Sequence, residues 1–416
     1  MPPYFYRVPL AVPYWNDATY RGILRSILSA GVIHGPDVGK LRSLVIQTLR
    51  VEEAVLCGSG SFALEFALRA CRVRQGEEVV LPTFCCTALV APILAVGALP
   101  VFADVSAELN LTAETVAPFL TERTKAIIVP HLFGNPANIN AIIDLARGRN
   151  ICVIDDAAQA LGATIDGQAL GSFGDVGILS FGQEKVCFGL GGGVVVSRNK
   201  NLLNGAVPVN GSPGSLSTAV RSLLSTLVWR RWRRWTLPVR RAFSRKSASP
   251  ELPPRPYRKE KMANLNAAVA SSLMQTLPGN IAARRERVNA YQDLLGTEQR
   301  LTLIPHRAGS ACLTQVIRVL PSRRGADPST SLIEALCRAG YEAQGSYVPI
   351  HLLPSYEPWV RERLPYAERV WADLIELPCE PDVSLDEVER IAVIVKKVIT
   401  SWPATRSRHV ALTRPA

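Results

Sequence analysis

Short apolar segments alternate with helical patterns in the first half of this chain, and this alternation strongly constrains its fold. Strand-like runs rich in Val and Ile are expected at 54–57, 78–81, 100–103, 126–130, 152–154, 176–180 and 193–197. Helical patterns are expected between several of them, at 61–71, 88–96 and 139–147. Apolar strands joined by helices form mostly parallel sheets that are buried on both faces. We therefore expect an α/β fold with such a sheet in a large domain.

The rest of the chain predicts further helices and a second unit. Residues 17–50 are expected to form two helices, 262–295 one long helix, and 301–398 a smaller C-terminal α+β unit. Loop-forming residues interrupt the pattern between these parts. The predicted divisions are a large domain at 1–210, an insertion or linker at 211–260, a helix and small domain at 261–402, and a tail at 403–416.

Polar residues follow several of the expected strands. Asp156, His131 and Ser59 fall at carboxyl ends of strands, where ligand sites of parallel sheets lie. The run Gly58-Ser-Gly-Ser61 stands between a strand and a helix, and the first turn of a helix offers free N–H groups to an anion. The same run also fits an ordinary strand-to-helix turn in which Ser61 caps the helix.

Asp156 and Lys185 are ionisable residues in apolar surroundings. Asp156 ends an apolar strand, where an acid is costly unless it is paired, and Asp155 is available to cap the following turn. Lys185 is either a surface residue with a partly buried stem or a functional amine. Enzymes that use pyridoxal phosphate (PLP) need a lysine that bonds to the cofactor aldehyde and a carboxylate that keeps the pyridine nitrogen protonated. Gln159 and Ser180 nearby in sequence favour the functional interpretation.

Several motifs in a fixed order resemble the DegT/StrS-type nucleotide-sugar aminotransferases, which are fold-type I PLP enzymes. The motifs are Gly58-Ser-Gly-Ser61, Pro82-Thr-Phe84, His131-Leu-Phe-Gly134, Asp156-Ala-Ala-Gln159, Ser180-Phe181 with Lys185, Gly191-Gly-Gly193, Met262-Ala-Asn-Leu-Asn-Ala-Ala268, Tyr347-Val-Pro-Ile-His351 and Leu377-Pro-Cys-Glu-Pro381. The resemblance implies transfer of an amino group from an amino acid to a keto sugar on a nucleotide, with L-glutamate as the expected donor. A keto-cyclitol or a lipid-linked sugar stays open as the acceptor. A homodimer with sites between its subunits is also implied.

The resemblance implies roles for individual residues. Lys185 matches the Schiff-base lysine, Asp156 the partner of the pyridine nitrogen, and Gln159 the residue near the ring hydroxyl. The phosphate is expected to bind at Gly60, Ser61 and Ser180. The substrate side is expected to include His131, Tyr347 and His351.

Two positions depart from the family pattern. An aromatic residue usually stacks on the ring two positions after Phe84, where this chain has Cys86, so Phe84 or Cys86 is expected to contact the ring. Lys259 replaces an asparagine that reaches the phosphate across the dimer interface, and its charge can still contact a phosphate. Two alternatives follow: a PLP-dependent sugar dehydratase of the same fold, which the presence of Lys185 disfavours, and a degenerate, membrane-associated relative without enzymatic activity.

The net charge of +12 is concentrated in one segment. Residues 221–261 carry 13 Lys and Arg residues against two Glu residues. Three tryptophans lie among arginines at 229–235, and a helix would place Val220, Leu224, Leu227, Val228, Trp232 and Trp235 on one face. This pattern predicts an interfacial helix on an anionic membrane through residues 220–246. An insertion that packs on its own domain or on a partner subunit is the alternative, and nucleic-acid binding is not expected without a recognised module.

The cysteines and histidines indicate the cellular compartment of the protein and whether it has a metal site. The nine cysteines are scattered, and most lie in apolar patterns where a reduced cysteine packs as a small hydrophobic residue. This favours a reducing cytoplasm, with the protein peripheral to the inner membrane face if the basic segment binds there. The five histidines form no ligand cluster, so no metal site is expected. The sequence predicts neither a membrane-spanning helix nor a signal peptide.

Overall fold

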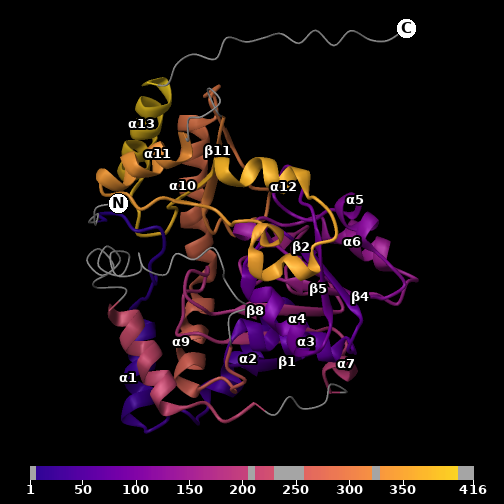
Figure 1. Cartoon of the computed structure of the whole chain (residues 1–416). Coiled ribbons are helices and arrows are strands. Elements are labelled where there is room, and N and C mark those ends of the chain that lie inside the picture. Colours follow the sequence, from indigo (N-terminus) through magenta and orange to yellow (C-terminus); the bar gives the residue numbers. More distant parts are fainter. Residues whose placement is uncertain (1–5, 205–210, 229–256, 321–327, 402–416) are drawn as a thin grey trace.

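The computed structural model describes residues 6–204, 211–228, 257–320 and 328–401, and two main sheets organise them (Figure 1). The larger sheet has seven strands in the order β1-β9-β8-β5-β4-β2-β3. They are β1 (Glu53–Cys57), β2 (Glu78–Pro82), β3 (Leu99–Ala103), β4 (Thr124–Pro130), β5 (Cys152–Asp156), β8 (Val176–Ser180) and β9 (Gly193–Ser197). Neighbouring strands are parallel except for the two pairs that β9 makes. The mostly parallel α/β sheet is therefore confirmed.

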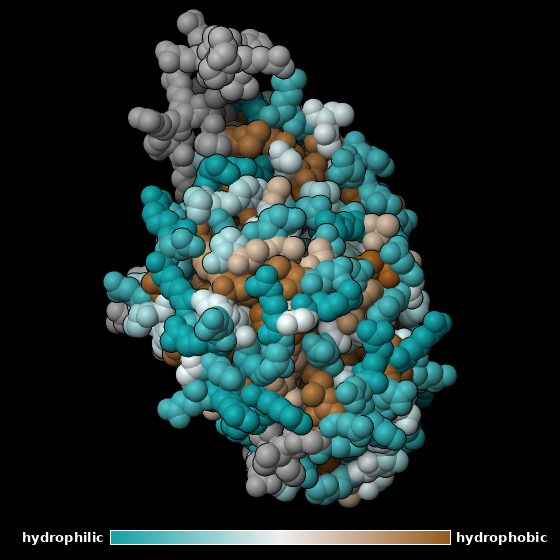
Figure 2. Space-filling view, turned by 90° about the vertical axis from the view of Figure 1, so that its right-hand side faces the viewer, coloured by the Kyte–Doolittle hydropathy of each residue, from teal (hydrophilic) through white to brown (hydrophobic). Residues whose placement is uncertain are grey.

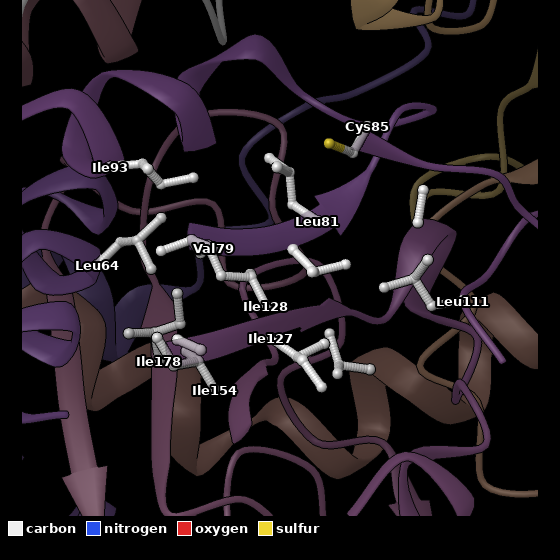
Figure 3. Packing of buried hydrophobic residues seen from close by; sticks show 14 of the residues in the cluster. Leu64, Val79, Leu81, Cys85, Ile93, Leu111, Ile127, Ile128, Ile154 and Ile178 are labelled. Carbon is white, nitrogen blue, oxygen red and sulfur yellow. The ribbon is translucent and has the colours of Figure 1, made fainter. Parts of the chain in front are cut away.

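Helices cover both faces of this sheet, and its strands are apolar on both sides for that reason. Ile178 and Val195 join a buried cluster that includes residues of α3, whereas Leu179 and Val194 join a cluster with residues of α2 and α9. All five residues of β8 and of β9 are buried. Figure 3 shows the packing around Ile154 and Ile178 in the first of these clusters. Because each buried aliphatic side chain stabilises the fold by about 1.5–3 kcal/mol, the strand ends are held firmly in place.

The helices confirm two predictions and correct one. The α-helices are α1 (Asp17–Leu28), α2 (Asp37–Leu49), α3 (Gly60–Ala70), α4 (Val90–Ala95), α5 (Ala113–Val116), α6 (Ile139–Ala146), α7 (Lys200–Asn204), α9 (Asn264–Gln275), α10 (Leu277–Leu295), α11 (Pro328–Arg338), α12 (Pro365–Val370) and α13 (Leu385–Ser401). Residues 216–228 are also helical. The 3₁₀ turns are Thr87–Leu89, Ala117–Phe119, Leu132–Gly134, Ile350–Leu352, Pro354–Trp359 and Trp371–Asp373. The two helices expected in 17–50 are present. The prediction of a single helix at 262–295 is wrong. The segment forms two helices, because α9 ends at Gln275 and α10 starts at Leu277 with a proline in its first turn.

The C-terminal unit is built on a four-stranded antiparallel sheet with the order β10-β11-β13-β12. Its strands are β10 (Leu301–Leu303), β11 (Gln315–Val319), β12 (Gln344–Gly345) and β13 (Leu374–Leu377), and a separate hairpin joins β6 (Thr164–Ile165) to β7 (Gln168–Ala169). Residues of α10, α11 and α13 pack with this sheet in one buried cluster. The N-terminal segment also joins this unit, since Val8 pairs with Tyr341 and Leu10 donates its N–H to Glu342. The predicted boundaries had assigned that segment to the large domain.

Two cysteines are not reduced, contrary to the expectation for the whole set. Cys71, which follows α3, forms a disulfide with Cys152 at the start of β5. The other seven cysteines are free. The two half-cystines are 81 residues apart in sequence, so their pairing depends on how α3 packs against the sheet.

The described part of the chain contains no helix that is both long and apolar enough to cross a membrane. It also contains no group of three or more side chains arranged to hold a metal ion. Residues 229–246, most of the segment 220–246 that is predicted to bind membranes, lie outside the described residues.

Candidate active site

A cavity of about 600 Å³ opens at the carboxyl ends of β5 and β8 and is closed on its other side by the C-terminal unit. Eight of the predicted site residues line it: Gly60, Ser61, Cys86, Asp156, Gln159, Ser180, Lys185 and Tyr347. A larger hollow of about 810 Å³ lies at the amino ends of the strands beside Cys71 and Cys152, and none of the predicted site residues lines it. The smaller cavity is therefore the candidate active site.

Asp156 is the last residue of β5 and is almost fully buried. Its Oδ1 accepts the N–H of Ala158 at 2.9 Å. Burial raises the pKa of the Asp156 carboxyl, while the Ala158 N–H and the positive charge of Lys185 act in the opposite direction. A buried carboxylate of this kind gains most from a cationic partner inside the cavity.

Asp155 does not cap the following turn as expected. Its Oδ2 accepts the N–H groups of Gly171 and Phe173 at 2.8 and 2.9 Å, and its Oδ1 lies 2.8 Å from Nε2 of His131. His131 is fully buried, and its Nδ1 accepts the N–H of Ala137 at 2.9 Å. Both ring nitrogens are thus used inside the protein. His131 lies behind the cavity wall, which corrects its expected position on the substrate side.

The first turn of α3 forms an anion cradle with the end of β8. Ser59, rather than Ser61, is the N-cap: its hydroxyl accepts the N–H of Phe62 at 3.1 Å. The backbone N–H groups of Gly60 and Ser61 have no hydrogen-bond partner among the described residues. A Cβ at Gly60 would lie only 3.1 Å from the hydroxyl oxygen of Ser180. Glycine therefore leaves room for a group between α3 and Ser180.

Lys185 lies in a loop that two backbone hydrogen bonds close. Phe181 donates its N–H to Gly192 and accepts the N–H of Gly191, both at 3.0 Å. Gly192 has a φ of +123°, a conformation that other residues rarely adopt. Lys185 is partly buried and lines the cavity. The loop thus brings the amine to the same cavity as Asp156.

An aromatic group lies beside Gln159. Gln159 accepts the N–H of Phe133 at 2.9 Å and donates to the Tyr347 hydroxyl at 2.9 Å. The ring of Tyr347 stacks on Phe133 and meets Phe84 edge-on, with centroids 6.1 and 5.9 Å apart. Phe84 is fully buried and does not line the cavity, whereas Cys86 does. Of the two predicted ring contacts, only Cys86 is therefore in position.

Lys259 and His351 also lie away from the cavity lining within this subunit. Nζ of Lys259 lies 2.8 Å from the buried Glu65 carboxylate, which also accepts a hydrogen bond from Tyr257. Burial acts to raise the pKa of Glu65, but these hydrogen bonds lower it. His351 lies 2.6 Å from Thr83 through Nδ1 and 3.3 Å from Glu368 through Nε2. The contact of Lys259 with a phosphate of a second subunit stays a prediction.

The C-terminal unit contributes polar residues that the sequence analysis missed. Gln344, Ser346 and Glu376 line the cavity. Glu376 stands in Leu374-Ile-Glu-Leu377, where a single acid looks like the solvent-facing position of an ordinary strand. The sequence carried no signal for it, because the contact depends on how β13 is placed against the large domain.

These residues fit PLP. The free N–H groups of α3 and the hydroxyls of Ser61 and Ser180 suit a phosphate, and the room at Gly60 admits it. The Asp156 carboxylate suits a protonated pyridine nitrogen, and Lys185 supplies the amine that the cofactor aldehyde requires. The mostly parallel sheet, covered by helices, is the architecture expected of a fold-type I enzyme. The fold and the site therefore define a PLP-dependent transaminase.

The chain belongs to the DegT/DnrJ/EryC1/StrS aminotransferase family, whose model matches residues 17–396. This result confirms the resemblance found in the sequence, the predicted enzyme class and the predicted cofactor, PLP.

Individual relatives resemble the chain along nearly its whole length. It is 28% identical to a UDP-N-acetyl-3-dehydro-α-D-glucosamine 3-aminotransferase of Acidithiobacillus ferrooxidans, over 92% of this chain and 94% of the relative. It is 28% identical to a GDP-perosamine synthase of Caulobacter vibrioides, over 84% and 86% of the two chains. The crystal structure of the aminotransferase TlmJ from Streptoalloteichus hindustanus superposes with a TM-score of 0.75 at 26% identity, over 94% of this chain and 99% of TlmJ.

Proposed function

We propose that this chain transfers an amino group from L-glutamate to a keto sugar carried on a nucleotide. The observation that carries this proposal is the meeting of Lys185 and Asp156 in one cavity at the carboxyl ends of parallel strands. The two curated relatives, one named for a UDP sugar and the other for a GDP sugar, support a nucleotide-linked acceptor.

The residues of the cavity divide the chemistry among them. When bound, PLP supplies a ring that withdraws electrons from the carbon bearing the amino group. Lys185 would hold the cofactor through Nζ. Once the amine of the donor has displaced it, the free Nζ would remove the proton from Cα of the donor and deliver it to the cofactor carbon bonded to the amino nitrogen. Asp156 would keep the pyridine nitrogen protonated through an ion pair between its carboxylate and the pyridinium, and burial would strengthen that pair. Gln159 would lie next to the ring hydroxyl, and Ser180 would help to hold the phosphate.

The substitution Lys185→Ala tests this assignment. We expect it to lower the rate of amino transfer by at least about a thousandfold, because the attachment point and the proton carrier are lost together. The measurement is the absorbance spectrum of the PLP-loaded protein before and after addition of L-glutamate. Lys200→Ala, at an exposed position, is the matched control. A Lys185→Ala protein that cycles donor and acceptor at the wild-type rate would falsify the proposal.

Product analysis and the same spectra separate the two alternatives. A dehydratase acts on the keto sugar by loss of water and forms no amino sugar, so mass analysis of the product distinguishes it from an aminotransferase. A degenerate relative would show no spectral change with L-glutamate even after PLP is added. The presence of Lys185 in the cavity favours the aminotransferase over both.

A homodimer is part of the proposal. Among the described residues that line the cavity, Lys185 is the one positively charged side chain, whereas nucleotide sugars and the cofactor carry several phosphate charges. A second subunit is a source of further cations at this site. Sedimentation equilibrium measures the oligomeric state, and a stable monomer with full activity would contradict the dimer.

We also propose that the basic segment 220–246 holds the enzyme at an anionic membrane surface in the cytoplasm. In the described helix 216–228, Val220, Leu224 and Val228 are 40, 56 and 47% exposed, although Leu227 from the predicted apolar face packs on the core. Exposed apolar residues followed by arginines and tryptophans suit a lipid interface. The side of the molecule on the right of Figure 1, by contrast, is mostly hydrophilic with scattered apolar residues (Figure 2).

A further inference from the structure

Glu376 lines the candidate active site but has no part in the chemistry described so far. It belongs to β13, where Ile375 and Leu377 are buried in the core of the C-terminal unit. Glu376 lies between them, is only partly buried, and forms part of the cavity wall. The strand alternation therefore aims a carboxyl group at the cavity rather than at bulk solvent.

Two neighbours hold the Glu376 carboxylate. Gln344 Nε2 donates to Oε2 at 3.2 Å, and the Ser346 hydroxyl donates to Oε1 at 2.9 Å. Gln344 is also the register partner of Glu376 in the β12–β13 pair, which fixes its position. An ionised carboxylate accepts about four hydrogen bonds, so each oxygen keeps capacity for one more donor. That remaining capacity suits hydroxyl groups of a ligand in the cavity.

The negative charges around Glu376 favour the sugar over L-glutamate at this part of the cavity wall. The cavity wall also contains the carboxylates of Asp156 and Glu184, against the single described cation, Lys185. The main effect on Glu376 is burial, which raises the pKa of its carboxyl to about 7, and the negative charge of Glu184 adds to it. Next to this wall a carboxylate of L-glutamate is repelled, whereas the sugar ring of the acceptor, apart from its nucleotide phosphates, offers neutral hydroxyl donors.

We propose that Glu376 is a substrate-positioning residue for the acceptor half of the reaction and accepts hydrogen bonds from hydroxyl groups of the keto sugar. This inference rests on the proposed function and adds the residue that recognises the sugar ring. Gln344 and Ser346 keep the carboxylate in place for that contact.

The substitution Glu376→Gln tests the inference, because the amide keeps the size of the side chain and removes its charge. Each half-reaction of the PLP-loaded enzyme is followed separately by absorbance, with L-glutamate as donor and UDP-N-acetyl-3-dehydro-α-D-glucosamine as acceptor. We expect kcat/KM for the acceptor to fall about ten- to a hundredfold, the range for a lost charge-assisted hydrogen bond. For L-glutamate, kcat/KM is expected to rise, because one repelling charge is gone.

A binding measurement complements the kinetics. Calorimetric titration with GDP-perosamine is expected to show about tenfold weaker binding to Glu376→Gln than to wild type. Glu334→Gln, in a surface pair with Arg338, is the control and leaves both measurements unchanged. Ser346→Ala is expected to lower kcat/KM for the acceptor as well, but by a smaller factor than Glu376→Gln.

The decisive quantity is the ratio of the two kcat/KM values. A ratio that Glu376→Gln leaves unchanged, because both half-reactions fall together or neither moves, means that Glu376 acts only in holding β12 and overturns the inference. A wild-type enzyme that converts L-glutamate but neither aminates UDP-N-acetyl-3-dehydro-α-D-glucosamine nor binds GDP-perosamine also overturns it, while the aminotransferase chemistry stands. A wild-type enzyme inert toward L-glutamate overturns the proposed function itself.

Discussion

At the residue scale, the Glu376 carboxyl in the cavity wall makes the free energy of unfolding depend on pH. Its pKa is raised by burial from 4.5 to about 7, and the negative charge of Glu184 acts in the same direction. Between these pH values the native state keeps a proton that the unfolded chain has lost. The free energy of unfolding therefore falls as pH rises from about 4.5 to 7, by at most about 3 kcal/mol from this group.

Glu376→Gln removes this pH dependence. We expect the variant to be more stable than wild type at pH 8 and to lose most of that advantage at pH 4.5, where the carboxyl is protonated in the native state and half protonated in the unfolded chain. Urea unfolding of both proteins at the two pH values measures the difference. An advantage of equal size at both pH values would show that the carboxyl titrates at its ordinary pKa.

At the residue scale, the sequence predicted the site where a charged side chain interrupts an apolar run. Lys185 and Asp156 are such residues, and the structure brings both into one cavity. His131 was misplaced because its position after a strand does not show that Asp155 and the Ala137 N–H already occupy its ring nitrogens. Glu376 was missed because its neighbours in the site lie on other elements.

Among the elements, β8 tolerates no side chain at Gly177. A Cβ at this position would lie 1.8 Å from the carbonyl oxygen of Gly171, part of the loop that Asp155 holds. We expect Gly177→Ala to lower the free energy of unfolding by about 3 kcal/mol or more, because backbone on both sides must move. The measurement is the denaturation midpoint, or the yield of folded protein where the variant does not accumulate.

Gly279→Ala provides the contrast to Gly177→Ala. Gly279 is an exposed residue of α10, and no atom lies within 4 Å of the position that its Cβ would take. Alanine there is expected to stabilise the helix by up to about 1 kcal/mol. Equal stability of the two variants would contradict the close approach of β8 and the Gly171 loop.

Element types were easier to predict than their directions and ends. The Val- and Ile-rich runs correctly gave the strands of the large sheet, because full burial on both faces leaves a continuous apolar signal. Nothing in β9 distinguishes it from a parallel strand, and its antiparallel direction goes with the loop 181–192 after β8, which contains no crossover helix. The break between α9 and α10 was missed because Pro278 is tolerated in the first turn of a helix.

At the scale of the whole molecule, the basic segment can be tested by its removal. Deletion of residues 229–250 spares the helix at 216–228, whose Ala219 and Leu223 are buried in the core. We expect the intact chain to float with phosphatidylglycerol vesicles at low salt and the shortened chain to remain in solution, with its L-glutamate reaction unchanged. Neutral phosphatidylcholine vesicles are the control. Equal flotation of both chains would contradict the lipid contact.

The Cys71–Cys152 disulfide and the cavity are features of tertiary structure that no local sequence pattern predicts. The bond joins the end of α3 to the start of β5, and the cavity needs the C-terminal unit to close it. The resemblance to a family gave the order of the motifs but not these contacts. Composition suggested only that the cysteines pack as apolar residues. Six of the seven free cysteines do so, since they are buried.

The position of the N-terminal segment has a consequence for the order of events during synthesis. Leu10 leaves the ribosome early, yet its partner Glu342 is 332 residues further along the chain. At roughly 5–20 residues per second, the segment waits on the order of tens of seconds for the surface on which it lies. Leu10 and Ala11 also line the cavity. The nascent enzyme therefore completes its cofactor pocket only after Glu342 has been synthesised, long after Leu10.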